Sequence, residues 1–165
     1  GYWSPYNILS VRSMGLEGRT KAELKWGKFR ITQDLSGSFV ISENVETAAV
    51  DDESVGKQLI YVPRFSGLSI TGVSFDDKWR MTLPLRYVSR RYTTSDHTAY
   101  LEPYFLVDIE LEYTAELRGG QTRLAVFTAI RNALDREYRM QNSHYMPGRF
   151  FETGLRIFFP FSETS

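Results

Sequence analysis

The stretch 105–131 constrains the fold of this chain more than any other. From Phe105 to Leu117 the odd positions carry Phe, Val, Ile, Leu, Tyr, Ala and Leu, and the even positions from 108 onward carry Asp, Glu, Glu, Thr and Glu. Successive side chains of a β-strand point to opposite faces, so this pattern predicts a strand with one apolar and one acidic face. Two glycines in the segment 118–121 predict a tight hairpin turn, after which a second alternating strand runs over 122–131. A helix does not fit, because the repeat is two residues rather than 3.6.

Five further segments show strand patterns, so we predict about seven long strands in all. They are residues 8–26, 29–41, 64–75, 79–90 and 151–161, the third having the weakest alternation. Pro84 lies inside the fourth of these segments, and proline has no N–H for a ladder hydrogen bond. We therefore expect an unpaired amide or a bulge there. The predicted fold class is all-β, an antiparallel up-and-down meander that on its own would be an open, curved sheet with two unpaired edges.

Short and long connections alternate along the chain. The short ones are residues 27–28, 76–77 and 118–121, and the long ones are 43–62, 93–104 and 133–149. In an up-and-down sheet this order places every short turn at one end and every long loop at the other. Transmembrane β-barrels of the outer membrane have this asymmetry.

Aromatic residues gather at both expected ends of the strands. Near the short turns lie Trp26, Phe29, Phe75, Trp79, Phe159 and Phe161, and near the long loops lie Tyr87, Tyr92, Tyr104, Phe105, Tyr138 and Phe151. Two belts of aromatic rings are typical of the two membrane interfaces, although strands of soluble sheets also favour aromatics.

Composition narrows the function classes. The 165 residues suit one domain, and 20 basic against 20 acidic residues give zero net charge, which argues against a nucleic-acid partner. There is no cysteine and no apolar run long enough for a transmembrane helix, whereas a membrane barrel needs only alternate apolar residues. The chain begins at Gly1 without a signal peptide, so we expect a fragment of a longer protein.

Two motifs in the third long loop give a resemblance to a known family. Residues 132–138 read Asn-Ala-Leu-Asp-Arg-Glu-Tyr, residues 146–150 read Met-Pro-Gly-Arg-Phe, and an aromatic-rich last strand follows. Together they resemble the C-terminal end of TonB-dependent outer-membrane receptors, and residues 56–59 with Pro63 look like an upstream loop of such receptors. Ala133-Leu134, Ile60 and the tail 162–165 depart from the family's usual pattern.

The resemblance implies a role in transport across the outer membrane of a Gram-negative cell. Residues 1–165 would be the C-terminal part of a twenty-two-stranded barrel, with the plug domain and signal peptide absent, the short turns periplasmic and the long loops extracellular. The intact receptor would take up a scarce nutrient such as a siderophore, cobalamin or glycan, powered by TonB through the missing N-terminal part. Its partners would be outer-membrane lipid and a small nutrient ligand. The alternatives are a passive outer-membrane porin, a soluble ligand-binding β-barrel and an outer-membrane barrel enzyme.

The polar face predicts ion pairs rather than a reactive site. An acidic strand carrying Asp108, Glu110 and Glu112 lies between two strands with basic residues: Arg80, Arg86 and Arg90 on one, Arg123 and Arg131 on the other. Opposite charges across strands stabilise a sheet by roughly 0.2–1 kcal/mol per pair. We expect no catalytic residues, no enzyme activity and no cofactor.

Candidate sites are confined to the loops. His97 and His144 lie in different loops, so a metal site is not predicted, and an acidic loop at 51–53 is expected to be solvated rather than calcium-bound. Residues at the long-loop end either contact an incoming ligand or belong to the aromatic belt; these are Arg90, Tyr92, Tyr100, Tyr104 and His144. The family-motif residues are expected to shape the last loop, since Asn and Asp side chains bond nearby backbone; these are Asn132, Asp135, Tyr138, Pro147, Gly148 and Arg149.

Overall fold

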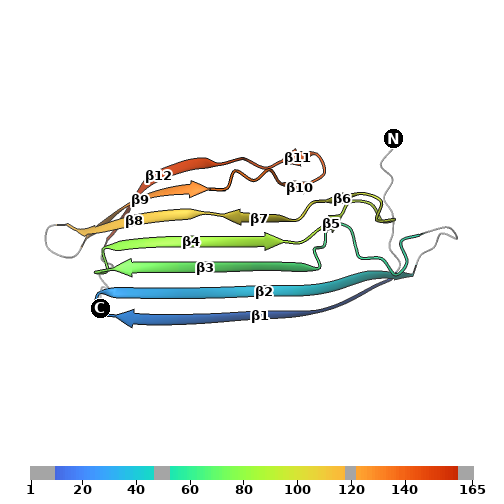
Figure 1. The fold of residues 1–165 in the computed structure, drawn as a ribbon, viewed down its shortest axis with the longest axis horizontal. Helices are drawn as coiled ribbons and strands as arrows, with labels where there is room; N and C mark the ends of the chain where they lie inside the picture. The colour runs from blue at the N-terminus through green and yellow to red at the C-terminus, as the bar shows by residue number, and fades with distance from the viewer. Residues whose placement is uncertain (1–9, 47–52, 118–121, 160–165) are drawn as a thin grey trace, which may run out of the picture.

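The computed structural model describes residues 10–46, 53–117 and 122–159 of the chain. These residues form one antiparallel sheet in the order β1-β2-β3-β4-β8-β9-β12, with β7 also pairing with β4, as Figure 1 shows. The long strands are β1 Ser10–Trp26, β2 Phe29–Glu46, β3 Phe65–Phe75, β4 Trp79–Val88, β7 Tyr104–Val107, β8 Ile109–Glu116, β9 Arg123–Arg131 and β12 Phe150–Phe158. The predicted all-β meander of about seven strands is confirmed.

The segment 105–117 is one predicted strand that the structure divides into β7 and β8 at Asp108. The residue opposite this position on β4 is Pro84: the amide of Asp108 donates to the carbonyl of Pro84 at 3.0 Å. Proline has no N–H to return a bond, so the ladder is interrupted for one residue. The register is the same on both sides, since Leu85 opposes Val107 and Thr82 opposes Glu110. Pro84 therefore leaves an unpaired position and not a bulge.

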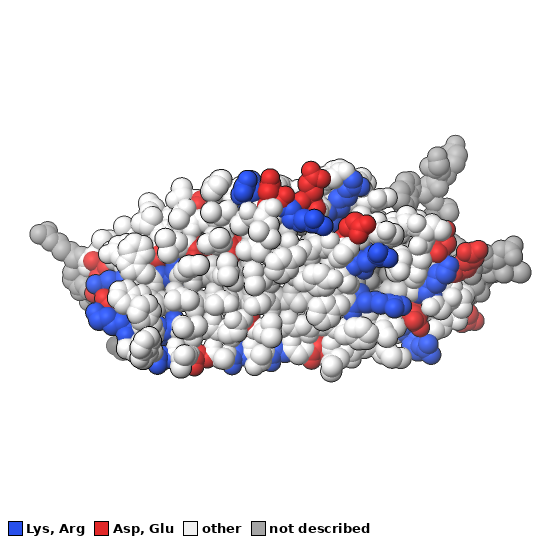
Figure 2. Space-filling model, in the orientation of Figure 1, with Lys and Arg blue, Asp and Glu red and all other residues white. Residues whose placement is uncertain are grey.

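The pairing registers place all apolar rows of the sheet on one face, which we call the outer face. Directly opposed residues point to the same side. The outer face begins on β1 with every second residue from Met14 to Trp26. It continues through the residues paired with them on each following strand and ends on β12 with every second residue from Phe151 to Ile157. None of these positions is Lys, Arg, Asp or Glu. Figure 2 shows one face whose middle is almost free of charged atoms, with charges gathered at the ends and edges.

Aromatic rings border this uncharged area at both ends. At the short-turn end Phe29 packs on Phe75 at 4.8 Å, and at the long-loop end Phe65 lies 5.8 Å from Tyr87. On β2, Phe29 and Phe39 mark the two borders. Ten residues of strand span about 33 Å, which at a tilt of about 45° gives a height of about 23 Å. That is close to the roughly 25 Å apolar band of outer-membrane barrels.

Two of the expected belt residues lie elsewhere. Tyr104 opposes Val88 on the opposite, inner face, is only 5% exposed, and packs on Tyr138 with ring centroids 4.7 Å apart. These two rings form part of a small core above the inner wall, together with Leu101 and Leu106. The even numbering of Tyr104 explains the difference, since alternation places it beside the acidic residues.

Three polar side chains on the outer face hydrogen-bond to one another across strands. Gln33, midway between the aromatic borders of β2, donates to the hydroxyl of Ser69 at 2.9 Å and accepts from Thr71 at 2.8 Å. In hydrocarbon, an unsatisfied polar group costs several kcal/mol, so this cross-strand arrangement suits a lipid-facing wall.

The long connections contain short paired segments. Two small hairpins stand at the right of Figure 1: β5 Arg91–Tyr92 with β6 Tyr100–Leu101, and β10 Arg139–Gln141 with β11 His144–Tyr145. The first long loop, expected to be exposed from Glu43 to Tyr61, is instead partly packed. β2 continues to Glu46, and the loop returns over it with Gln58 2% and Asn44 2% exposed.

The sheet is open among the described residues. β1 pairs only with β2 and β12 only with β9, which leaves the two unpaired edges that the sequence predicts for this part of a barrel. The expected turn at 118–121 and the acidic residues 51–52 lie outside the described residues.

Candidate functional site

An ion-pair network lies on the inner face, where β8, β9 and β12 run side by side. Arg131 of β9 contacts three carboxylates: Glu110 at 3.0 Å, Glu152 at 2.9 Å and Asp108 at 3.7 Å. Arg156 of β12 contacts Glu110 at 3.4 Å and also pairs with Glu112. Two guanidinium groups thus join four carboxylates: two from β8, one from β12, and that of Asp108 between β7 and β8.

A close approach between β9 and β12 positions one of these arginines. Arg156 lies over the ring of Phe127 at 4.1 Å, and that ring covers Gly154. A Cβ at Gly154 would lie 2.6 Å from the ring, so only glycine fits beneath it. The aromatic ring over a glycine holds the guanidinium above the acidic row of β8.

Arg131 pairs with the acidic strand as expected, but the other expected basic partners do not. β8 does lie between β4 and β9, but Arg80 and Arg86 of β4 form no ion pair within the described part of the chain, and neither does Arg123, which lies over Phe158 at 5.5 Å. The second basic partner is Arg156, two strands away from β8. The Arg156 side chain is long enough to reach across β9 to the carboxylates of β8. The strand register predicts contacts only between residues on adjacent strands.

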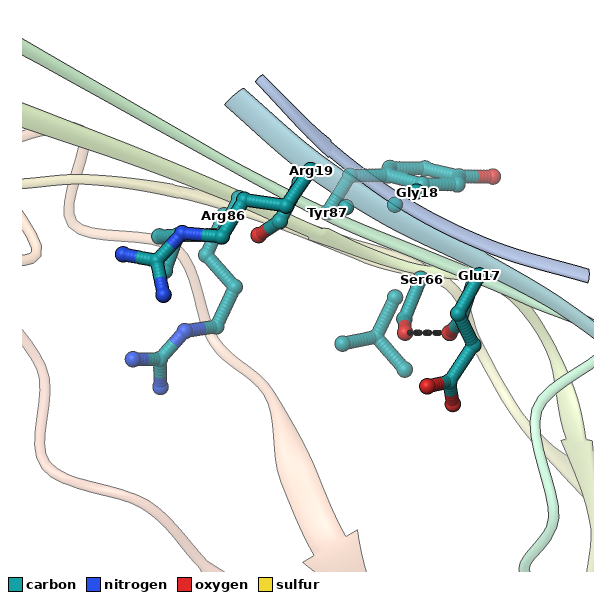
Figure 3. A pocket seen from close by; sticks show the side chains of 12 residues that line it. Glu17, Gly18, Arg19, Ser66, Arg86 and Tyr87 are labelled. Carbon is teal, nitrogen blue, oxygen red and sulfur yellow. Dashed lines mark hydrogen bonds between the residues drawn. The ribbon is translucent and has the colours of Figure 1, made fainter. Parts of the chain in front are cut away.

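A second polar area lies on the inner face of β1–β4, in a hollow of about 590 Å³. Figure 3 shows Arg19 and Arg86 extending to the same side of the sheet as Glu17, while Tyr87 lies on the opposite side. Arg19 donates two hydrogen bonds to the Asp34 carboxylate, of 2.9 and 2.5 Å. The hydroxyls of Ser66 and Ser38 form a hydrogen bond of 2.8 Å. The inner face is therefore ionised and hydroxylated over its whole width, as suits a wall in contact with water or polar protein.

The family-motif residues form a turn at the base of the last loop. Asn132 is 4% exposed and bonds the backbone of Arg136 in both directions at 2.9 Å, and its amide also donates to the Pro147 carbonyl at 3.3 Å. Asp135 accepts from the amide of Arg149 at 2.8 Å. Asn132 and Asp135 have φ of +50° and +52°, a conformation that Asn and Asp tolerate better than most residues.

The five candidate ligand-facing residues do not form a single cluster. Arg90 lies over Tyr100 at 4.0 Å, Tyr92 stacks on His97 at 3.6 Å, and Tyr104 is buried. His144 is exposed on the β10–β11 hairpin. Ligand contact by these residues stays a prediction.

Two loop residues have shifted pKa values. Hydrogen bonds from the Thr94 hydroxyl, then from the amide and hydroxyl of Thr98, lower the pKa of Asp96 to about 2. Desolvation, followed by the nearby Tyr104, raises the pKa of Tyr138. Both shifts keep each group in its usual charge state at neutral pH.

The long loops are linked to one another by residues to which the sequence assigned no role. The ring Nε2 of His97 lies 2.7 Å from the Gln58 carbonyl, and the ammonium of Lys57 donates to the Asp96 carbonyl at 2.9 Å. Gln58 in turn accepts from the backbone amide of Ser42 at 3.1 Å. The Gly-Lys-Gln-Leu stretch that resembles the family thus docks the first loop on β2 and on the β5–β6 hairpin.

The described residues offer no metal-binding cluster. They contain no group of three or more His, Asp or Glu side chains arranged to hold a metal ion. They also contain no helix of the length and apolarity that would carry it through a membrane.

Comparison with known proteins identifies the architecture. Residues 1–133 match the family model described as TonB dependent receptor-like, beta-barrel. The fold is similar to that of BauA, the ferric preacinetobactin receptor from Acinetobacter baumannii, with a TM-score of 0.61 and 11% identity over 90% of this chain and 27% of that one. It is also similar to FyuA, the ferric yersiniabactin uptake receptor from Yersinia pestis, with a TM-score of 0.61 and 17% identity over 90% of this chain and 24% of that one.

The chain therefore spans about a quarter of the length of these two receptors. A search of curated proteins finds no match. Members of the matched family are outer-membrane β-barrels that act as transporters and not as enzymes. The uncharged outer face, the ionised inner face and the family match over most of the sequence agree: the chain belongs to the family of TonB-dependent receptor-like β-barrels.

Proposed function

We propose that the chain is the C-terminal part of a receptor barrel that takes up a scarce nutrient, such as a siderophore, cobalamin or glycan, across the outer membrane. The observation that carries this proposal is the sorting of side chains on one sheet. An outer face without charge over about 23 Å of height suits lipid, and an inner face with a six-residue ion network suits a polar interior.

The proposal includes energy supply by TonB, acting on a plug domain in the intact protein. The inner wall supports it physically, because Arg80 and Arg86, which form no ion pair with the described residues, leave charge available to a polar body inside the barrel. A ferric siderophore is the ligand class to test first, because BauA and FyuA are receptors for ferric siderophores.

Uptake by the full-length protein in its own cell tests both parts. Strains lacking the gene for this protein, or lacking TonB, would be grown with a ferric siderophore, cobalamin or an oligosaccharide as the sole source of the limiting nutrient. We expect both strains to lose growth on the same ligand class. Uptake that needs this protein and continues without TonB would identify a passive porin instead. Normal growth of the receptor-deficient strain on all three classes would refute the proposed nutrients.

A further inference from the structure

Arg91 is the one arginine of the described chain that is almost fully buried. It begins β5 and is 6% exposed, yet no carboxylate lies within ion-pair distance among the described residues. A buried charge is costly unless other groups stabilise it, so its actual partners indicate what it does.

Those partners belong to a loop nearly fifty residues further along the chain. The guanidinium donates to the carbonyl of Arg139 at 2.7 Å and to that of Met140 at 3.3 Å, both in β10. It also lies 5.2 Å from the ring centroid of Tyr104. Its Nε has no hydrogen-bond partner among the described residues. The two terminal nitrogens of the Arg91 guanidinium thus donate to two consecutive backbone carbonyls of the β10–β11 hairpin.

Few other contacts hold the hairpin among the described residues: Tyr138, just before it, packs on Tyr104 at 4.7 Å, and Arg139 lies over the ring of Tyr145 at 3.9 Å. Only two residue pairs join β10 to β11, and Met140 and Tyr145 are 49% and 65% exposed. The Asn132 turn described above fixes the base of this loop but not its far end. Segments with few buried contacts and exposed hydrogen bonds open most easily.

A cavity of about 310 Å³ depends on where this hairpin lies. Tyr100, Glu102 and Tyr104 line it from the β5–β6 side, and Arg139 and Tyr145 line it from the hairpin. Because the two walls belong to different loops, the cavity exists only while the hairpin stays against the β5–β6 segment.

We propose that Arg91 is the positioning residue that holds the β10–β11 hairpin against the β5–β6 hairpin, so that it forms one wall of the cavity at the long-loop end of the barrel. Arginine suits this role because its planar guanidinium bonds two acceptors at once and never loses its charge. A lysine ammonium would reach one carbonyl as a point charge. The proposal is independent of which nutrient the intact receptor carries.

Trypsin cleavage tests this contact directly. The carbonyl to which Arg91 makes its shorter hydrogen bond belongs to the Arg139–Met140 peptide bond, and trypsin cleaves after arginine. The experiment uses the full-length receptor in lipid vesicles. The variants are Arg91→Gln, Arg91→Lys and the matched control Arg90→Gln, which removes the neighbouring exposed arginine. Cleavage after Arg139 is followed by mass spectrometry, and hydrogen exchange of 139–146 is measured in parallel.

Cleavage of a transiently open segment follows the population of the open form, and bonds to charged donors are the stronger ones, so Arg91→Gln should be cut at least about tenfold faster. Arg91→Lys should lie between that variant and the parent, and Arg90→Gln should match the parent. Equal rates for Arg91→Gln and the parent, or equal acceleration by Arg90→Gln, would overturn the proposal. If both Arg91 variants fail to assemble while Arg90→Gln assembles, Arg91 is a folding residue of the barrel, which also overturns it.

Discussion

Replacing Ile109 by arginine tests the inside–outside assignment at the middle of the wall. Ile109 is on the outer face of β8, four residues from Phe105 and four from Tyr113, which lie at the two aromatic borders. Four residues correspond to about 13 Å of strand and, at a tilt of about 45°, to about 9 Å of depth. An arginine near the bilayer midplane of an outer-membrane barrel costs about 2–4 kcal/mol. We therefore expect Ile109→Arg to lower the folding equilibrium constant about 30- to 900-fold.

Two controls separate depth and face from charge alone. Ala115→Arg adds the same charge on the same face beyond the Tyr113 border, where the cost falls to about 0–1 kcal/mol. Glu110→Gln alters the inner face. It removes one carboxylate from a part-exposed network in which Arg131 keeps Glu152 and Arg156 keeps Glu112, so its cost should be about 1 kcal/mol or less.

The assay is the urea midpoint of the full-length receptor assembled in phospholipid vesicles, followed by tryptophan fluorescence. Ile109→Arg should shift the midpoint clearly more than either control. If Ile109→Arg and Glu110→Gln shifted it equally, or if Ala115→Arg cost as much as Ile109→Arg, the lipid-facing placement of the odd positions of β8 would be wrong.

Three further predictions follow from individual contacts. Asn132→Ala removes both hydrogen bonds to the Arg136 backbone and leaves buried polar groups unpaired. The local stability of 133–149 should fall by about 1–3 kcal/mol, and amide hydrogen exchange there should be correspondingly faster. Unchanged exchange would rule out the structural role of Asn132. Gly15→Ala places a Cβ 2.7 Å from a backbone oxygen of β2, so it should lower the urea midpoint, at a cost of about 1–3 kcal/mol. Gly18→Ala meets open space and should leave the midpoint unchanged. Equal effects of the two variants would contradict the close approach of β1 and β2 at Gly15. The folded pKa of Asp96, about 2, is below the ordinary 3.8, so its carboxylate stabilises the 93–99 turn above that ordinary value, and this stability is lost as the pH falls from about 4 to about 2. Hydrogen exchange of the turn measured against pH should show this loss in the parent and not in Asp96→Asn, and a loss between pH 5 and 7 in the parent would refute the assignment.

The sheet could be predicted from the sequence because its period of two residues is unbroken over most strands. The alternation fixes which side chains share a face, and the alternating loop lengths fix which strand ends meet. The sequence predicts an unpaired amide or a bulge at Pro84, and the interruption opposite it, at Asp108, follows because proline cannot return a ladder bond. Alternation correctly predicts the face on which a residue lies. The placement of Tyr104 in the aromatic belt was wrong because it relied on the residue type, whereas its even position puts it on the inner face.

The contacts between loops could not be predicted in the same way. The hairpin of β10 and β11 has only two residue pairs, too few for a visible period, so the acceptors of Arg91 have no sequence signal. The partnership of Arg156 with Glu110 spans two strands and depends on the stack over Phe127, which register alone does not specify. Gln58 lies in a stretch that resembles the family, yet its burial depends on how far β2 extends, and the acidic residues beside it in the loop predict solvent exposure.

Thiol labelling of single cysteine variants along β7 and β8 tests the sorting of side chains most directly. Because the given chain contains no cysteine, Val107→Cys, Ile109→Cys and Leu111→Cys can be compared with Asp108→Cys and Glu110→Cys, in the full-length receptor within its membrane. We predict that a lipid-soluble thiol reagent labels the three odd positions and that a hydrophilic one labels only the two even positions. Hydrophilic labelling of the odd positions, with the even positions reached only through lipid, would contradict the assignment of the apolar face to the membrane.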